Sequence, residues 1–220
     1  MKHGKIFNYV TLALLTAALS GGGTLAQDKN GEKKDAAAAG QPSESEMMAK
    51  MMELAKTGEH HKVLEASVGT WNYQVKMWMS PDPSAPPSTS SGRTVTRAVM
   101  GGRYFISDHS GMMQMPGMDG KMSDVEFKGM AIEGYDNVKQ KYVASWIDNM
   151  GTGIMLMEGT YDDGAKTFTY IGEEEPMPGM KTKFREIIKN IDPNHRTFQW
   201  YEDRGGKEVK TMEISFSRQT

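Results

Sequence analysis

The fold is decided by the stretch Gly134-Tyr135-Asp136-Asn137-Val138-Lys139-Gln140-Lys141-Tyr142-Val143-Ala144-Ser145-Trp146-Ile147-Asp148. Its Asp-Asn pair is typical of a tight turn, and the aromatic and β-branched residues on both sides are typical of strands. The stretch therefore predicts a β-hairpin that turns between Asp136 and Gln140. Because similar segments recur through the second half of the chain, we expect this hairpin to be the central piece of an all-β barrel.

Ten strands are expected in that barrel. They cover residues 71–79, 92–100, 103–110, 125–135, 141–148, 153–161, 166–172, 181–190, 195–202 and 207–218. Strands joined by hairpins place alternate connections at opposite ends of a barrel. The connections after the even-numbered strands are tight, whereas the odd-numbered strands are mostly followed by longer ones, at 80–91, 111–124, 149–152 and 173–180. We therefore expect an antiparallel up-and-down barrel with one closed end and one mouth rimmed by loops.

The first 26 residues are typical of a cleaved secretory signal. Two lysines precede an apolar run at residues 9–19, and small residues follow as far as Ala26. The run is about half of the roughly 20 residues that span a bilayer, so the mature chain is expected to lack an integral membrane segment. We expect export to the periplasm or the medium. The chain has no cysteine, so its stability cannot come from disulfides.

Three segments follow the predicted signal. Residues 27–42 contain no large apolar side chain, which is typical of a disordered linker. Residues 43–67 begin with a capping-box sequence, Ser43 with Glu46, and continue with apolar residues at helical spacing. We expect this helical segment to cover the closed end. Residues 68–220 form one barrel domain.

The net charge argues against nucleic acid as a partner. Removal of the signal takes away Lys2 and Lys5, which leaves 24 Lys and Arg against 28 Asp and Glu, a formal charge of −4. Such a chain offers little basic surface to neutralise phosphates.

The two ends of the barrel domain are expected to meet. The first strand starts at the closed end and the tenth finishes there, so Trp71 and Arg218 should be neighbours. Gly69-x-Trp71 together with a basic residue in the last strand resembles the calycin superfamily of lipocalins and fatty-acid-binding proteins, in which the cation packs over the indole. Gly69, Trp71 and Arg218 are therefore expected to have a structural role.

A closer resemblance covers residues 61–218. It rests on His61-Lys62-x-Leu64, Val68-Gly69-Thr70-Trp71, Gly101-Gly102-Arg103, Gly134-Tyr135-Asp136-Asn137, Lys141-Tyr142-Val143, Trp146-Ile147-Asp148, Glu158-Gly159-Thr160-Tyr161 and the closing residues 208–218. Together these strings resemble the bacterial domain-of-unknown-function family 1579. The resemblance implies a calycin-like barrel and leaves the biochemistry open.

No catalytic motif accompanies the histidines of the mature chain, which are His60, His61, His109 and His195. Carboxylates of the central strands, Glu133, Asp148 and Glu158, could act as acid or base if they faced a cavity. The alternation of these strands does not determine which of them face inward. The catalytic candidates are Asp148, Glu158 and Tyr135, although Asp148 at a strand end is better explained by hydrogen bonds to the loop backbone. We expect no enzyme activity and no cofactor.

The methionines, twenty in all, are clustered. Met-Pro-Gly-Met occurs at 115–118 and again at 177–180, and the connection parity assigns both copies to the mouth. Thioethers are soft ligands that select Cu(I), and the candidates are Met112, Met113, Met115, Met118, Met177 and Met180. Methionine is also an adaptable contact for apolar ligands. Because no cysteine or well-placed histidine lies beside these residues, the sequence favours the apolar role over a metal site.

The sequence thus favours a protein that binds a small apolar molecule through the mouth, because barrels of about eight to ten strands have room for one such ligand. The expected ligand-binding residues are Tyr135, Trp146, Asp148, Met115, Met118, Met177 and Met180. Three alternatives stay open, namely an envelope interaction module with a filled barrel, a periplasmic Cu(I)-binding protein, and an enzyme that uses Asp148 and Glu158 in the cavity.

Overall fold

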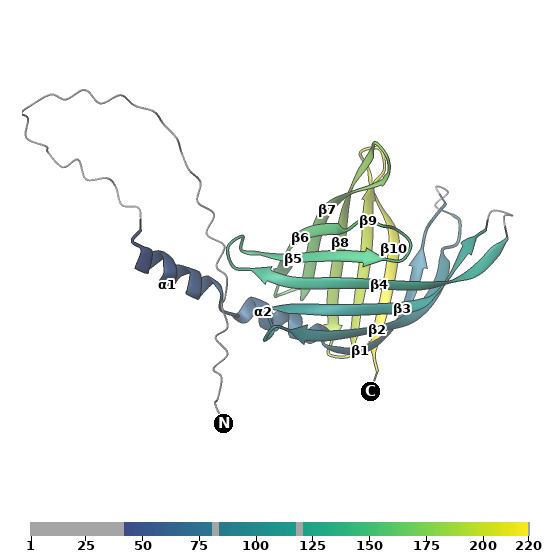
Figure 1. The fold of residues 1–220 in the computed structure, drawn as a ribbon. Helices are drawn as coiled ribbons and strands as arrows, with labels where there is room; N and C mark the ends of the chain where they lie inside the picture. Colours follow the sequence, from purple (N-terminus) through teal and green to yellow (C-terminus); the bar gives the residue numbers. More distant parts are fainter. Residues whose placement is uncertain (1–41, 81–83, 118–120, 220) are drawn as a thin grey trace, which may run out of the picture. The chain divides into compact units, whose positions relative to one another are not determined.

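The computed structural model describes residues 42–80, 84–117 and 121–219. Within them lie ten strands: β1 (Gly69–Met77), β2 (Ser88–Val99), β3 (Tyr104–Pro116), β4 (Met122–Asp136), β5 (Lys141–Asp148), β6 (Met155–Asp162), β7 (Thr167–Met177), β8 (Met180–Asp192), β9 (His195–Asp203) and β10 (Glu208–Arg218). Each strand pairs with the next, and β1 pairs with β10, so the sheet closes (Figure 1). The predicted antiparallel up-and-down barrel is confirmed. The predicted signal, and all of the predicted linker except Pro42, lie outside the described residues.

Two of the predicted loops are paired strand instead. β3 and β4 stay in register as far as Pro116 opposite Met122, and β7 and β8 reach Met177 opposite Met180. Prolines and glycines in these stretches predicted loops at 111–124 and 173–180. That prediction was wrong, because a partner strand on each side of the hairpin satisfies the backbone up to the tip. The mouth is bordered here by long two-stranded hairpins.

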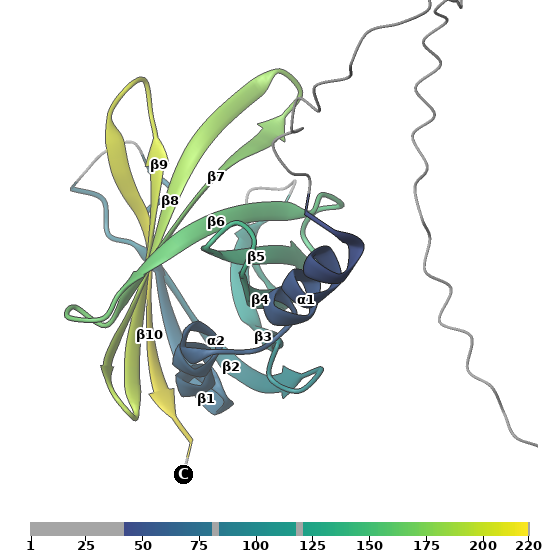
Figure 2. The ribbon, with the colours of Figure 1, turned by 90° about the vertical axis from the view of Figure 1, so that its left-hand side faces the viewer.

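A helical segment covers the closed end, as predicted. It consists of α1 (Glu44–Leu54), α2 (Glu59–Leu64) and the 3₁₀-helix η1 (Glu65–Ser67), which leads directly into β1 (Figure 2). The covering contact comes from α2, whose Leu64 is buried in the core of the barrel. The methionines of α1 are exposed instead, from 47% at Met47 to 66% at Met52. None of these helices, within the described part of the chain, is long and apolar enough to cross a bilayer.

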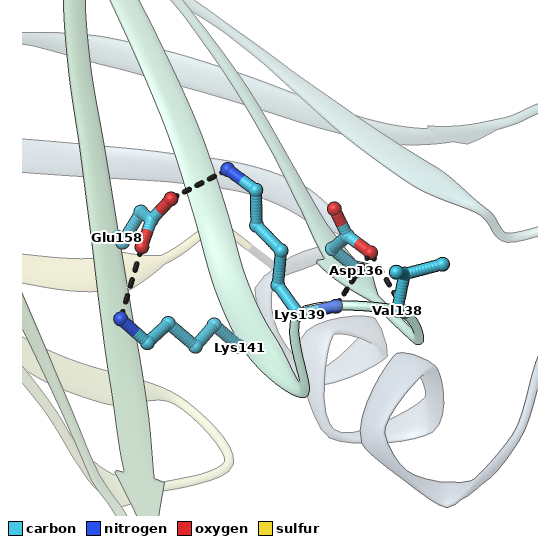
Figure 3. Close-up of polar contacts among 5 residues, drawn as sticks. All are labelled: Asp136, Val138, Lys139, Lys141 and Glu158. Carbon is cyan, nitrogen blue, oxygen red and sulfur yellow. Dashed lines mark hydrogen bonds and ion pairs between the residues drawn. The ribbon is translucent and has the colours of Figure 1, made fainter.

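The β4–β5 turn fastens the end of α1 to the barrel. The Asp136 carboxylate accepts hydrogen bonds from the backbone N–H groups of Val138 and Lys139, at 2.8 and 3.0 Å, which holds the turn in shape (Figure 3). The Asn137 side-chain amide then donates to the carbonyls of Leu54 and Lys56, at 2.7 and 2.8 Å. These carbonyls belong to the last turn of the helix and its exit, where intrahelical donors are missing.

Replacing Asn137 with alanine is expected to loosen α1. The change removes two hydrogen bonds to carbonyls of the helix end, and we expect a loss of about 1–2 kcal/mol of unfolding free energy. Amide hydrogen exchange should become faster across residues 44–54 than in the parent. Val138→Ala is the matched control, since Val138 lies in the same turn and is 74% exposed. Unchanged exchange in Asn137→Ala would show that other contacts hold the helix.

Trp71 and Arg218 are in contact at the closed end. Their Cα atoms are register partners across β1 and β10, and the Arg218 guanidinium lies 4.1 Å from the centre of the indole. The indole Nε1–H donates to the Ser67 carbonyl at 2.8 Å, and Arg218 donates to the carbonyls of Val68 and Ala66. Gly69 permits this arrangement, because its φ is +126° and a Cβ there would lie 2.5 Å from the guanidinium.

The larger packed core cluster joins α2 to the inward faces of several strands. Leu64 of α2 meets buried aromatic residues from five strands there: Phe105, Tyr142, Phe168, Tyr170, Phe184 and Trp200. Their rings meet edge to face or stacked, as with Tyr142 on Phe168 at 5.0 Å and Phe184 on Trp200 at 4.2 Å. Trp200 and Met157 of this cluster also line a cavity inside the barrel.

Candidate ligand-binding site

A cavity of about 420 Å³ lies inside the barrel. Its wall is built from alternate strand residues, because successive side chains of a strand point to opposite faces of the sheet. On β9 and β10 these inward residues are Arg196, Phe198, Trp200, Glu202, Met212, Ile214 and Phe216. The inward face of the closed sheet therefore forms the wall of the cavity.

One wall of the cavity carries an oriented indole. Trp146 of β5 donates from Nε1 to the Asp148 carboxylate at 2.7 Å, and the other carboxylate oxygen accepts the Met150 backbone N–H at 2.9 Å. Gly129 of β4 provides the space, since a Cβ there would lie 2.4 Å from the indole ring. Both acceptor oxygens of Asp148 are thus engaged in positioning Trp146 and the strand end.

Methionines form much of the remaining wall. The members that line the cavity are Met77, Met112, Met113, Met150, Met155, Met157 and Met212. Unbranched, polarisable thioether side chains adapt to ligands of different shape. The wall is therefore apolar and deformable over a large part of its area.

The inner end of the cavity carries a buried cation. Arg196 is only 8% exposed, and its guanidinium lies between the rings of Trp71 and Phe216, 4.6 and 4.7 Å from their centres. Nε has no hydrogen-bond partner, and no acceptor among the described residues bonds to the guanidinium. Burial lowers the pKa of Arg196 to about 10, against the raising influence of Glu133, so the group remains a cation at neutral pH.

Five acidic residues line the same cavity, namely Glu133, Asp148, Glu174, Glu186 and Glu202, and two of them are buried deeply enough to matter for its charge. Glu133 of β4 accepts a hydrogen bond from the Tyr170 hydroxyl at 3.3 Å, and Glu186 of β8 has no hydrogen-bond partner among the described residues. Burial raises the pKa of both, and burial together with the nearby Glu133 raises the pKa of Glu186 to about 8. Glu186 is therefore a neutral carboxylic acid at pH 7, able to donate as well as accept a hydrogen bond.

A buried histidine, His109, also lines the cavity. His109 Nδ1 lies 2.8 Å from the Thr94 hydroxyl, and its ring meets Trp146 edge-on at 5.1 Å. Burial lowers the pKa of His109 to about 4, with Arg196 acting in the same direction. The part of the chain that the structure describes brings together no group of three or more His, Asp or Glu side chains that could hold a metal ion.

The predicted site residues are divided between several places. Trp146 and Asp148 line the cavity. Tyr135 lies at the closed end, where His60 of α2 stacks on it at 4.2 Å. Glu158 is on the outer surface, where its carboxylate pairs with the ammonium groups of Lys139 and Lys141 at 2.6 and 3.0 Å (Figure 3). The structure thus separates Glu158 and Tyr135 from Asp148.

The predicted methionines are also divided. Met112 and Met113 line the cavity, whereas Met115 is not among its described lining residues. Met177 and Met180 lie opposite each other at the tip of the β7–β8 hairpin, with 61% and 60% of their surfaces exposed. Met118 lies outside the described residues. Of the predicted methionines that the structure describes, Met112 and Met113 line the cavity.

Sequence reasoning missed Arg196 and Glu186. Each is a charged residue in phase with large apolar residues two positions away, Arg196 with Phe198 and Glu186 with Ile188. The sequence signal for such a residue is a charge on the otherwise apolar face of a predicted strand. If the strand assignment is right, this charge is buried, and buried charges usually have a function or a specific partner. Glu133 is among the carboxylates that the sequence offers as acid or base, but the sequence does not determine whether its side chain points inward.

The comparisons with known proteins concern fold and family. The family model described as "Protein of unknown function (DUF1579)" matches residues 56–218. Sixteen chains of solved structures match, and one is the crystal structure of Rv2717c from M. tuberculosis. That structure is 12% identical in sequence, with a TM-score of 0.50 over 75% of this chain and 100% of that chain. At this identity the likeness concerns the fold alone. No curated protein matches.

Proposed function

The chain belongs to the family described as "Protein of unknown function (DUF1579)", and from the interior of this member we propose that it binds a small, largely apolar molecule inside the barrel. The observation that carries the proposal is the cavity of about 420 Å³, whose lining surface is mostly apolar and is built largely from aromatic and methionine side chains. Small-molecule sites typically have this composition, and the mouths of β-barrels are a common location for them. From the signal-like residues 1–26 we also infer export.

The size of the cavity limits the ligand. A non-hydrogen atom with its share of space occupies about the volume of one liquid water, roughly 30 Å³. A volume of about 420 Å³ therefore suits a molecule of roughly 14 non-hydrogen atoms. This is the size of a medium-chain alkyl compound or a substituted bicyclic aromatic.

The positions of the carboxylates favour binding over the enzyme alternative. Asp148 uses both oxygens on Trp146 and Met150, and Glu158 is paired with two lysines on the outer surface. The two groups do not face one substrate, so they cannot share acid and base roles. An interaction module with a filled barrel is less well supported, because the interior is hollow.

Filling the cavity is expected to abolish binding. Ala131 lines the cavity, so Ala131→Phe places a ring in the ligand space, while the neighbouring Ile132 is 40% exposed and does not line the cavity. We expect 1-octanol to bind the parent and Ile132→Phe with equal affinity, and Ala131→Phe at least tenfold more weakly. Isothermal titration calorimetry measures this, with the melting temperature recorded for each variant. Absence of binding to the parent would refute the proposal.

A further inference from the structure

Arg196 is the most unusual buried group in the molecule. A charge removed from water is costly unless it is paired and hydrogen-bonded, and the cost of an unmade bond is largest for charged groups. Two aromatic faces at 4.6 and 4.7 Å supply part of the compensation. They do not satisfy the N–H donors, and Nε is without a partner. The guanidinium is thus held by two aromatic faces, and its buried Nε has no protein acceptor.

Resting on the proposed function, we propose that the ligand is an amphipathic monocarboxylic acid whose carboxylate binds Arg196 at the inner end of the cavity. A carboxylate matches the guanidinium geometrically, because two parallel N–H groups reach two oxygens. Arg196 is adjacent to the closed end, one residue into β9, and its Cα partner Phe216 lies near the end of β10. The alkyl or aromatic part of the ligand then extends along the methionine wall toward the mouth.

No carboxylate among the described residues forms an ion pair with Arg196. Glu133 is the acidic residue that influences Arg196 most, but the described residues contain no ion pair between the two, and its carboxyl is engaged by the Tyr170 hydroxyl. Burial makes Glu133 harder to ionise. Arg218, the other cation on Trp71, differs because its guanidinium donates to the carbonyls of Ala66, Val68 and Pro193. Of the two guanidinium groups on Trp71, Arg196 is therefore the one that can pair with an external anion.

The charges at the inner end of the cavity select between head groups. Arg196 is the cation there, and Glu133, the acid that influences it most, is buried, which raises the pKa of that carboxyl. An ammonium head at this place would meet the Arg196 cation beside an acid that is hard to ionise. An alcohol would leave the cation without a counter-charge. The expected order of affinity is carboxylate, then alcohol, then amine.

The test compares three molecules with one alkyl chain, octanoate, 1-octanol and octylamine, by isothermal titration calorimetry at pH 7. We expect octanoate to bind the parent at least tenfold more tightly than 1-octanol, the factor given by about one charge-assisted hydrogen bond. Arg196→Met should lose this preference. Arg196→Lys should keep part of the preference, because it keeps the charge without the fork. Arg218→Met is the matched control and should leave the preference unchanged.

The outcomes are distinguishable. If none of the three compounds binds the parent, the proposed binding function fails and this inference fails with it. If octanoate and 1-octanol bind equally, the head-group inference is overturned while the apolar binding function stands. Should Arg196→Met not fold, the comparison of octanoate with 1-octanol on the parent decides the matter. An unaltered preference in a folded Arg196→Met would also overturn the assignment of Arg196.

Discussion

Replacing Trp71 with alanine is expected to lower the free energy of unfolding by about 3–5 kcal/mol, the usual range for a buried aromatic residue. The indole is 1% exposed, donates to the Ser67 carbonyl at 2.8 Å, and is covered by the guanidinium groups of Arg196 and Arg218. Its removal leaves a cavity beneath two cations and breaks the junction between η1, β1 and β10. Chemical denaturation monitored by far-UV circular dichroism measures the change.

A double-mutant cycle with Arg218→Ala shows whether the contact itself contributes. We expect the double variant to lose less than the sum of the single losses, because Arg218 stacks on the indole at 4.1 Å. Trp78→Ala is the control, since Trp78 is half-buried at the other end of β1 and has Lys210 over its ring at 5.2 Å. It should cost clearly less than Trp71→Ala. Strictly additive effects at Trp71 and Arg218 would contradict the role of their contact.

Replacing Glu186 with glutamine is expected to stabilise the protein at pH 7, by about 3 kcal/mol, and to have little effect at pH 4. The folded protein raises the pKa of Glu186 from 4.5 to about 8, so folding retains a proton that the unfolded chain releases. Stability is therefore highest below pH 4.5 for this group and falls by about 1.4 kcal/mol per unit as the pH rises toward 8. Glutamine, which does not ionise, removes that penalty.

The measurement is the difference in unfolding free energy between variant and parent, taken at intervals from pH 4 to pH 8. Taking the difference limits the contributions of the other titratable residues of the cavity, which are present in both proteins: His109, Glu133, Asp148, Glu174, Arg196 and Glu202. Glu158→Gln is the matched control with the opposite sign, because Lys139 and Lys141 lower the pKa of Glu158. A difference for Glu186→Gln that does not change with pH would mean that the pKa of this carboxyl is the same in the folded and the unfolded protein.

The sequence by itself determined the features that depend on local pattern and on connectivity. The turn at Asp136 follows from side-chain to backbone hydrogen bonds within three residues, and the cap at Ser43 is equally local. The contact of Trp71 with Arg218 also followed from the sequence, because an even number of hairpin-linked strands returns the chain to the end at which it started. These inferences need only the order of the strands.

Only the tertiary structure decided which face of each strand is inside. A period of two assigns residues to two faces, but both faces here carry apolar and charged side chains. Leu156 and Ile171 are 67% and 60% exposed on the outer surface, whereas Glu186 and Arg196 are each 8% exposed within the barrel. The rule that apolar residues face inward therefore fails at the positions that matter for the ligand.

The hollow interior and its polar end also required the closed barrel. Arg196, Glu186 and Glu133 come from β9, β8 and β4, and they face one cavity only because the sheet closes through β1 and β10. Whether space remains between them depends on the summed volumes of inward side chains from all the strands, including small ones such as Ala131 and Ala144. No local stretch of sequence carries that sum, so the ligand site is a property of the assembled fold.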